Sequence, residues 1–314
     1  GVARFALGVT EAANFPAGLK AITEWFPARE RALVTGLFNS GVALGIVVAS
    51  IGVPLLASTW GWRATFVATA ALGLCWLPFW IFAHRGAPLP AATVATAVSA
   101  RAPRWRELLR YRQTWAYVLT KSLGDPVWWF YLFWLPKYLA AQFDVRGTAV
   151  IPYLTAVYVA ADIGCIGAGW LSSALLKRGV ALNAARKGTM ALLACIMTPA
   201  VIVAANLDDP QLAIALIALA CGAHQAWSTM VFTMATDLFP SRMVGSVSGF
   251  GGFVAGSVSI VAAELIGRVL DTDSTLYAPI FIAAGLLYPL ALGVFHGLSP
   301  RMEPVRVAAA PEPR

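Results

Sequence analysis

The chain has 314 residues, of which 59% are hydrophobic and 12% are charged, and its formal net charge is +8. This composition excludes a soluble enzyme or binding domain, because a soluble domain of this size could not bury so much apolar surface. The positive charge does not indicate a nucleic-acid partner either, because the basic residues lie mainly in loops between long apolar segments.

Nine such segments follow one another along the chain. Each has about the 20 residues that a helix needs to cross roughly 30 Å of hydrocarbon. Because the backbone inside a bilayer must satisfy its own hydrogen bonds, each segment is predicted to be a helix. We therefore expect an all-α polytopic membrane protein, with segments at about 5–26, 34–57, 63–83, 114–140, 149–175, 187–206, 211–236, 244–267 and 277–298.

The cations between these segments are distributed unevenly. If the loop that holds Arg29 and Arg31 is cytoplasmic, 16 of the 23 Lys and Arg residues lie on the cytoplasmic side, four on the other side and three inside segments. The positive-inside rule then predicts a cytoplasmic C-terminus in an inner membrane of bacterial type. An odd number of segments places Gly1 outside, and the chain begins without Met. We interpret it as a fragment that lacks an odd number of N-terminal spans.

One connection, at about 84–113, is longer than the others. Its second part places Trp105, Leu108 and Leu109 at helical spacing among arginines, which predicts an amphipathic helix on the cytoplasmic surface. A long linker between two helical bundles is typical of secondary transporters. The chain divides into 1–83, the remainder of an N-terminal bundle; 84–113, the linker; 114–298, a six-helix bundle; and 299–314, a cytoplasmic tail. A complete second bundle implies that three helices are missing from the first.

Arg4 and Glu11 are ionisable groups in the first part of the first segment, where each costs several kcal/mol unless it is paired or hydrated. Arg4 and Glu11 are seven residues apart and share one helical face. Arg4 is suited to receiving a substrate carboxylate, while Glu11 is suited to carrying a proton. The alternative is that both pair structurally with helices outside this chain.

The fourth segment carries a possible ion pair and a run of aromatic residues. Lys121 and Asp125 are four residues apart, which suits a pair within one helix. The run Trp128-Trp-Phe-Tyr131-Leu-Phe-Trp134 lies in the middle of the segment. Its rings can stack on a sugar ring, or they can form an aromatic belt at the membrane surface. In the fifth segment Asp162 is an isolated carboxylate, with functional and structural explanations equally open.

The seventh segment places His224, Trp227 and Ser228 on one face. A histidine in the membrane can serve a proton path because it titrates near physiological pH, or it can hydrogen-bond a neighbouring helix. No metal-ligand spacing is present, so we expect no metal and no cofactor. The cysteines are interpreted as buried free thiols: Cys75, Cys165, Cys195 and Cys221.

At these residues the chain resembles the major facilitator superfamily, and within it the anion:cation symporters, most closely the hexuronate transporters. The resemblance covers essentially the whole chain. It is carried by residues 4–17 (RFALGVTEAANFPA), 24–27 (EWFP), 29–32 (RERA), 38–41 (FNSG), 125–139 (DPVWWFYLFWLPKYL), 223–228 (AHQAWS) and 237–240 (DLFP).

The resemblance implies the major facilitator fold with helices four to twelve of twelve present. Arg4 matches a fourth-helix arginine, and Glu11 matches a carboxylate implicated in proton coupling. Substrate contacts are implied for Asn39 on the cavity-facing fifth helix and for residues of the cavity-lining helices seven and ten, namely Trp128, Tyr131, His224, Gln225 and Trp227. Asp125 and Asp162 are further candidates for proton coupling. The stretch 169–179 resembles the cytoplasmic gating loop, but Ser173 stands where an acid is usual, which weakens a charge contact there.

We therefore expect a proton-coupled importer of a hexuronate anion, acting by alternating access. Its partners are a small anionic substrate, the proton and the lipid bilayer, and we expect a monomer. Another organic anion, such as an aldonate or an aromatic carboxylate, is the main alternative, because arginine recognises any carboxylate. A non-transporting gene fragment is a third possibility. A membrane enzyme is disfavoured, since the sequence shows no clustered catalytic groups.

Overall fold

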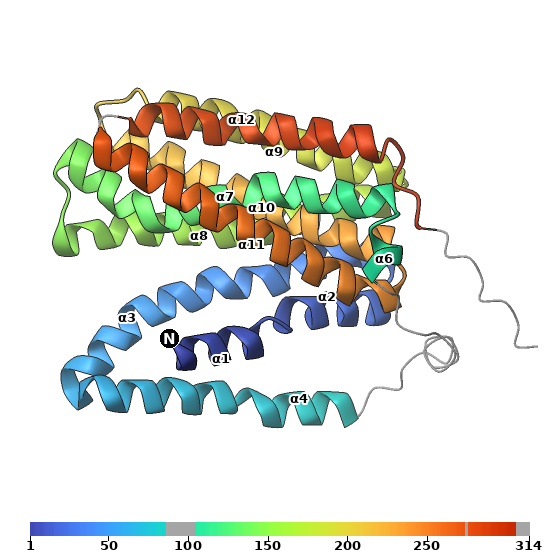
Figure 1. Ribbon diagram of the computed structural model, residues 1–314, viewed down its shortest axis with the longest axis horizontal. Coiled ribbons are helices and arrows are strands. Elements are labelled where there is room, and N and C mark those ends of the chain that lie inside the picture. The colour runs from blue at the N-terminus through green and yellow to red at the C-terminus, as the bar shows by residue number, and fades with distance from the viewer. Residues whose placement is uncertain (86–104, 274–275, 306–314) are drawn as a thin grey trace, which may run out of the picture.

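The computed structural model describes residues 1–85, 105–273 and 276–305. In these ranges the chain is largely helical and contains no strand, which confirms the all-α prediction. Figure 1 shows the long helices lying side by side along the long axis of the molecule. In chain order the helices are α1 Val2–Glu11, α2 Asn14–Trp25, α3 Ala28–Leu74, α4 Trp76–Arg85, α6 Trp105–Leu108, α7 Arg112–Phe143, the 3₁₀ helix η1 Gly147–Val150, α8 Ile151–Lys177, α9 Leu182–Ala204, α10 Pro210–Leu238, α11 Ser241–Thr272 and α12 Tyr277–Leu298.

Among the described residues, six helical stretches are long and apolar enough to cross a membrane. They are Ala28–Ala83, which joins α3 to α4, and the helices α8, α9, α10, α11 and α12. The predicted segments 34–57 and 63–83 both lie in the first stretch, whose 56 residues are enough for two crossings. Helix α7 has 32 residues and is long enough, but it is less apolar than these six.

The predicted segment 5–26 is divided between α1 and α2. Helix α1 ends at Glu11 and α2 begins at Asn14. Pro16 lies in the first turn of α2, where its missing N–H costs no helical hydrogen bond. The prediction of one continuous first span is therefore wrong, and the break separates a fully exposed α1 from a partly buried α2.

Helix α3 contains a sharp corner at Gly61, whose φ of 76° is readily adopted only by glycine. In Figure 1, α3 runs to the left, turns at its far end and returns with α4. Trp60 and Trp62 flank the corner and are 67% and 60% exposed, and the Arg63 guanidinium lies 4.4 Å from the centroid of the Trp62 ring. Two predicted spans are thus joined by a corner without an intervening loop.

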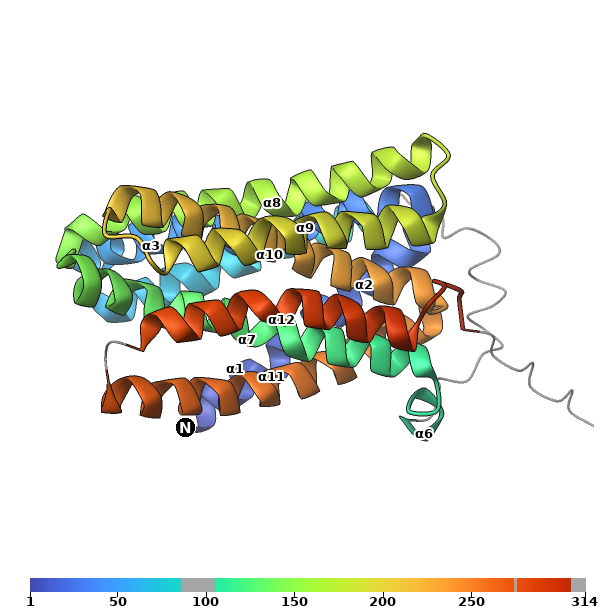
Figure 2. The same ribbon diagram turned by 90° about the horizontal axis from the view of Figure 1, so that it is seen from above.

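The six C-terminal helices form the well-packed part of the molecule. Seen from above, α8 and α11 lie on opposite sides of this bundle, with α10, α7 and α12 between them (Figure 2). The largest fully buried side chains include Trp227 of α10, Tyr288 of α12 and Phe130 of α7. Because aromatic side chains bury the most apolar area, these residues dominate the core.

The N-terminal helices attach to this bundle through α3 and α2. Helix α3 packs along α8, and α2 packs against α11. At the first contact the two backbones approach closely, because a Cβ on Gly36 would overlap the carbonyl oxygen of Cys165, and one on Gly169 would overlap that of Ala32. Glycine at these two positions allows a contact between backbones.

Three sequence-based expectations are corrected. The predicted amphipathic helix is a single turn, α6, with Leu108 buried and Leu109 exposed; the linker residues 86–104 lie outside the described ranges. Arg186, assigned to a loop, lies inside α9 and is fully buried. All four cysteines are free, but Cys75 and Cys195 are exposed, and only Cys165 and Cys221 are buried.

Candidate functional site

A histidine at the centre of the C-terminal bundle is held by three helices. The Nδ1 atom of His224, on α10, shares a short hydrogen bond with the hydroxyl group of Tyr288, on α12. The Trp128 ring of α7 stacks on the imidazole, with ring centroids 5.6 Å apart and an angle of 7° between the planes. Trp227 meets Tyr288 edge to face at 5.3 Å. His224 is 3% exposed, so this cluster fixes both the position and the orientation of the imidazole.

Tyr288 is a member of this cluster that the sequence analysis missed. It stands in an otherwise apolar stretch of the last segment, Leu286-Leu-Tyr-Pro289, and nothing in that local pattern marks it. Its significance comes from a contact between α12 and α10, because Tyr288 lies 64 residues after its partner His224 in the sequence. The one sequence feature that could have drawn attention to Tyr288 is Pro289, which follows it inside the helix.

Several buried polar atoms beside the cluster have no hydrogen-bond partner among the described residues. They include the hydroxyl oxygens of Tyr117, Thr120 and Tyr131 and the indole nitrogen of Trp227. Gly124 lies against that indole, since a Cβ at this position would be 3.4 Å from Trp227 Nε1. An unpaired buried donor or acceptor costs about 1–3 kcal/mol. These atoms are therefore suited to binding water or the hydroxyl groups of a ligand.

The predicted ion pair of α7 is confirmed. Lys121 Nζ lies 2.7 Å from Asp125 Oδ2, and Lys121 is only 7% exposed. The ammonium group also lies over the Phe232 ring, 4.4 Å from its centroid. Phe232 in turn stacks on Phe15 of α2, with centroids 4.9 Å apart. The ion pair thus adjoins an aromatic contact between α2 and the C-terminal bundle.

Three other predicted residues lie where α3, α8 and α10 meet. The side-chain amide of Asn39, 3% exposed, donates to Thr229 Oγ1 at 3.3 Å and to Cys165 Sγ at 3.3 Å. Gln225 is also buried, and its backbone carbonyl accepts from Cys165 Sγ at 3.6 Å. Asp162, on α8, has a buried Oδ1 without a hydrogen-bond partner in the described ranges.

Arg4 and Glu11 are not brought to this region. Both are exposed on α1, which buries none of its residues. No hydrogen bond or ion pair joins either side chain to another described residue. Their functional roles remain predictions.

A buried ion network that the sequence analysis missed joins α3 to the ends of α8, α9 and α10. The guanidinium of Arg186 donates to Asp237 Oδ2 at 2.8 Å, to Ser172 Oγ at 2.8 Å and to the carbonyl of Ala28 at 2.9 Å. Arg31 donates to the carbonyl of Thr236 at 2.6 Å and lies 3.8 Å from Asp237 Oδ1. Hydrogen bonds of this kind offset the cost of burying the charges.

The network also bears on Ser173, which stands where the resemblance implies an acid. Its hydroxyl accepts from the backbone N–H of Leu33 at 3.2 Å. A contact between α8 and α3 is therefore kept at this position without a charge, and Arg186 and Asp237 provide charge contacts nearby.

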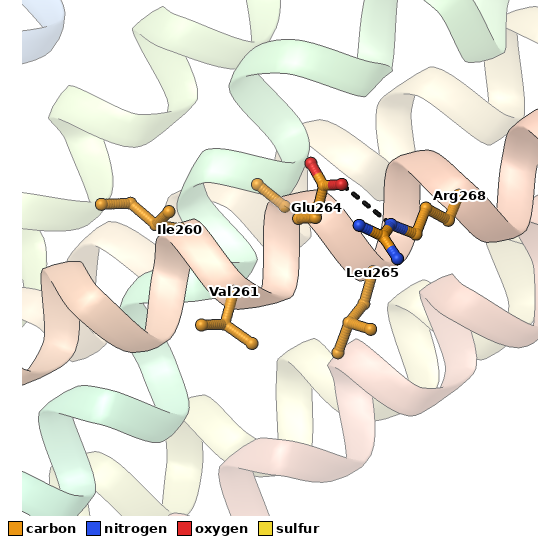
Figure 3. Close-up of a pocket in the computed structure, with 6 residues that line it drawn as sticks. Ile260, Val261, Glu264, Leu265 and Arg268 are labelled. Atoms are coloured by element: carbon orange, nitrogen blue, oxygen red, sulfur yellow. Dashed lines mark hydrogen bonds and ion pairs between the residues drawn. The ribbon is translucent and has the colours of Figure 1, made fainter.

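Two larger cavities lie away from these clusters. One of about 770 Å³, between α2, α3 and α4, is lined by residues that include Phe38, Trp76 and Trp80. The other, of about 620 Å³, is a groove on α11 where Glu264 and Arg268 form an ion pair at 2.8 Å (Figure 3). These two side chains are 64% and 75% exposed, so their pairing contributes little to stability. None of the predicted site residues lines either cavity.

Comparisons with known proteins identify the family. The family model of the Major Facilitator Superfamily matches residues 2–263. The hexuronate transporter of Escherichia coli strain K12 is 31% identical over 299 residues, which cover 89% of this chain and 68% of that protein. The galacturonate transporter of Dickeya chrysanthemi is 32% identical over 187 residues, which cover 54% of this chain and 53% of that protein. The hexuronate transporter of Bacillus subtilis strain 168 is 27% identical over 296 residues, which cover 90% of this chain and 68% of that protein.

A solved structure shares the fold. The crystal structure of a bacterial homologue of the iron transporter ferroportin, in an outward-facing state, superimposes with a TM-score of 0.69 at 14% sequence identity. The match covers 89% of this chain and 66% of that one, so the chain spans about two thirds of the solved protein. The relatives are transporters, which agrees with the expectation that the chain is not an enzyme. The chain is a multi-pass membrane protein that belongs to the Major Facilitator Superfamily.

Proposed function

We propose that the protein takes up a hexuronate anion together with a proton, by alternating access, across a bacterial inner membrane. The names of the relatives support the substrate class, since two are hexuronate transporters and one is a galacturonate transporter. The uneven distribution of cations supports a cytoplasmic C-terminus. We further propose that it acts as a monomer.

The observation that carries the proposal is the cluster of aromatic rings and unpaired donors in the C-terminal bundle. Trp128 is stacked on His224 and provides an aromatic surface for a sugar ring. Trp227 Nε1 and the Tyr131 hydroxyl are buried and unpaired among the described residues. A ligand rich in hydroxyl groups would remove the cost of leaving these atoms without partners.

The other proposed substrate contacts are Gln225, on α10, and Asn39, whose amide already bonds to Thr229. Arg4 is proposed to attract the substrate carboxylate, because a guanidinium can bind both carboxylate oxygens. Glu11, Asp125 and Asp162 are the carboxylates proposed to carry protons. Of these, Asp162 has a buried oxygen free to accept a hydrogen bond in the described part of the chain.

Uptake of labelled galacturonate and glucuronate tests this proposal, using the whole open reading frame in which the 314 residues are encoded. Trp128→Leu should lower uptake about tenfold or more, which corresponds to about 1.4 kcal/mol. Trp129→Leu is a matched control, because Trp129 is the next residue, is 40% exposed and stacks on Phe133 rather than on His224. Equal losses in the two variants would remove Trp128 from the site. Uptake of an aldonate or an aromatic carboxylate in place of both hexuronates would show that the proposed substrate is wrong.

A further inference from the structure

Lys121 has no role in the function proposed above, although among the cations of the described residues only Arg186 is more deeply buried. Its side chain is 8% exposed, while the side chain of its partner Asp125 is 27% exposed. The only charged group within ion-pair distance of the ammonium, in the described part of the chain, is Asp125 Oδ2 at 2.7 Å. A buried charge of this kind is expensive to maintain in a membrane unless it serves a purpose.

The ammonium group is incompletely satisfied. A lysine ammonium has three N–H donors. In the described ranges the ammonium group makes one ion pair, with Asp125, and one cation–π contact, with the Phe232 ring. The ammonium group therefore keeps spare N–H donors that an additional oxygen ligand would satisfy.

The charges around the pair restrict what that ligand can be. The charges of the pair act on Tyr117 of α7, His224 of α10 and Tyr288 of α12, so these three titratable groups lie close to it. The ion pairs of α2 and α11 lie within each helix, as Lys20 with Glu24 and Arg268 with Glu264, and neither joins Lys121 or Asp125 in the described ranges. Asp125 is thus the carboxylate that balances Lys121 among the described residues, and a second anion beside it would meet its negative charge.

We propose that Lys121 binds the carboxylate of the transported anion, and that this carboxylate replaces Asp125 on the ammonium group when Asp125 takes up a proton. The O–H bond forms on Asp125 with a proton from water, and the hydrogen bond from Lys121 Nζ passes from Asp125 to the incoming carboxylate. Release of the substrate reverses both steps and returns the proton to water. This inference rests on the proposed function, which it deepens by naming the group that links anion binding to proton binding.

The exchange leaves the buried charge unchanged. Before it, the site holds one ammonium and one carboxylate; after it, the site holds the same ammonium, a neutral carboxylic acid and the carboxylate of the substrate. Because the cost of net charge is large in a low-dielectric interior, this balance favours uptake of one proton with each anion.

The test measures binding of D-galacturonate to the whole gene product in lipid nanodiscs, by tryptophan fluorescence, together with proton uptake reported by a pH dye. In the wild type, affinity should weaken as the pH rises, because binding takes up about one proton per anion. Asp125→Asn mimics the protonated acid, so it should bind with undiminished affinity at all pH values and take up no proton. Lys121→Gln should weaken binding about tenfold or more.

Two further variants keep the result interpretable. Lys137→Gln, on the same helix, makes the same chemical change at an exposed lysine and should leave affinity within about twofold. Lys121→Gln leaves Asp125 without its partner and can lower folding stability, so the double variant Lys121→Gln/Asp125→Asn, which buries no unpaired charge, provides a second measurement. It should unfold near the wild-type temperature and still bind about tenfold or more weakly.

The outcomes separate this inference from the proposed function. Three results would overturn the exchange and leave the proposed substrate standing. They are galacturonate binding that does not change in the Lys121 and Asp125 variants, binding that takes up no proton, and loss of binding in Asp125→Asn. Binding of a different carboxylate with the pattern described here would overturn the substrate and support the exchange. Galactose binding as tightly as galacturonate would overturn the exchange, and a wild-type protein that binds no carboxylate would overturn both.

Discussion

Replacing the buried Arg186 with alanine should destabilise the protein more than replacing an exposed arginine. The side chain is 0% exposed and donates to Asp237, to Ser172 and to the carbonyl of Ala28. Without it, Asp237 remains buried, with Arg31 at 3.8 Å as its nearest cation in the described ranges. Removing one partner of a buried pair costs about 3–5 kcal/mol, because the remaining charge is uncompensated.

This cost can be measured by thermal unfolding in detergent. At about 2–4 °C per kcal/mol, the scale for domains of roughly 150–250 residues, Arg186→Ala should lower the unfolding temperature by at least about 6 °C. Arg178→Ala is the matched control, because Arg178 is exposed at the end of α8, and such positions contribute about 0–1 kcal/mol. Replacing both members of the pair, as Arg186→Met with Asp237→Leu, should recover most of the loss, since no fully buried charge is then left unpaired and Arg31 keeps its hydrogen bonds to backbone carbonyls.

The reasoning would be refuted if Arg186→Ala unfolded within about 2 °C of Arg178→Ala. It would also be refuted if the double replacement were as unstable as Arg186→Ala alone. The first result would mean that the network is hydrated or absent in the protein, and the second that apolar packing rather than charge compensation determines the stability at this junction.

Three other outcomes are expected. A cysteine replacing Arg178 should react with impermeant thiol reagents only from the cytoplasmic side and one replacing Asp208 only from the other; both positions are exposed, and labelling from one side alone would contradict the topology. Gly164→Ala should lower the unfolding temperature by several degrees, because its Cβ would overlap the backbone of α10, whereas Gly167→Ala, with nothing within 4 Å, should not; equal temperatures would contradict the close approach. Glu11→Gln should abolish uphill uptake driven by a pH gradient while leaving counterflow, and uphill uptake with unchanged pH dependence would remove Glu11 from proton coupling.

The helical class, the family and the Lys121–Asp125 pair were predictable because each depends on local sequence. Apolar segment length identifies membrane helices, and a spacing of four residues within one helix brings a cation and an anion together at 2.7 Å. His224 was recognised as a polar group at membrane depth for the same reason. Its partner Tyr288 was not recognised, because only the packing of α12 against α10 brings the two together.

Arg186 shows a second limit of local reasoning. The sequence analysis assigned this arginine to a cytoplasmic loop because it lies between the apolar segments 149–175 and 187–206. The structure buries it in α9 instead, where an acid from α10, a hydroxyl from α8 and a carbonyl from α3 meet its three nitrogens. A compensated charge of this kind requires partners from three other helices, and periodicity within one segment carries no information about them.

The corner at Gly61 has a further consequence, for depth in the bilayer. Exposed tryptophans next to an arginine, as at Trp60 and Arg63, settle at the boundary between lipid and water. Counting back along α3 at about 1.5 Å per residue, a hydrocarbon layer of roughly 30 Å ends about twenty residues earlier, beside Ser40. Asn39 lies near that limit by this count, yet it bonds to Cys165 at the middle of α8, so α3 must cross the layer at an angle (Figure 1) and a substrate bound at Asn39 would lie inside the membrane.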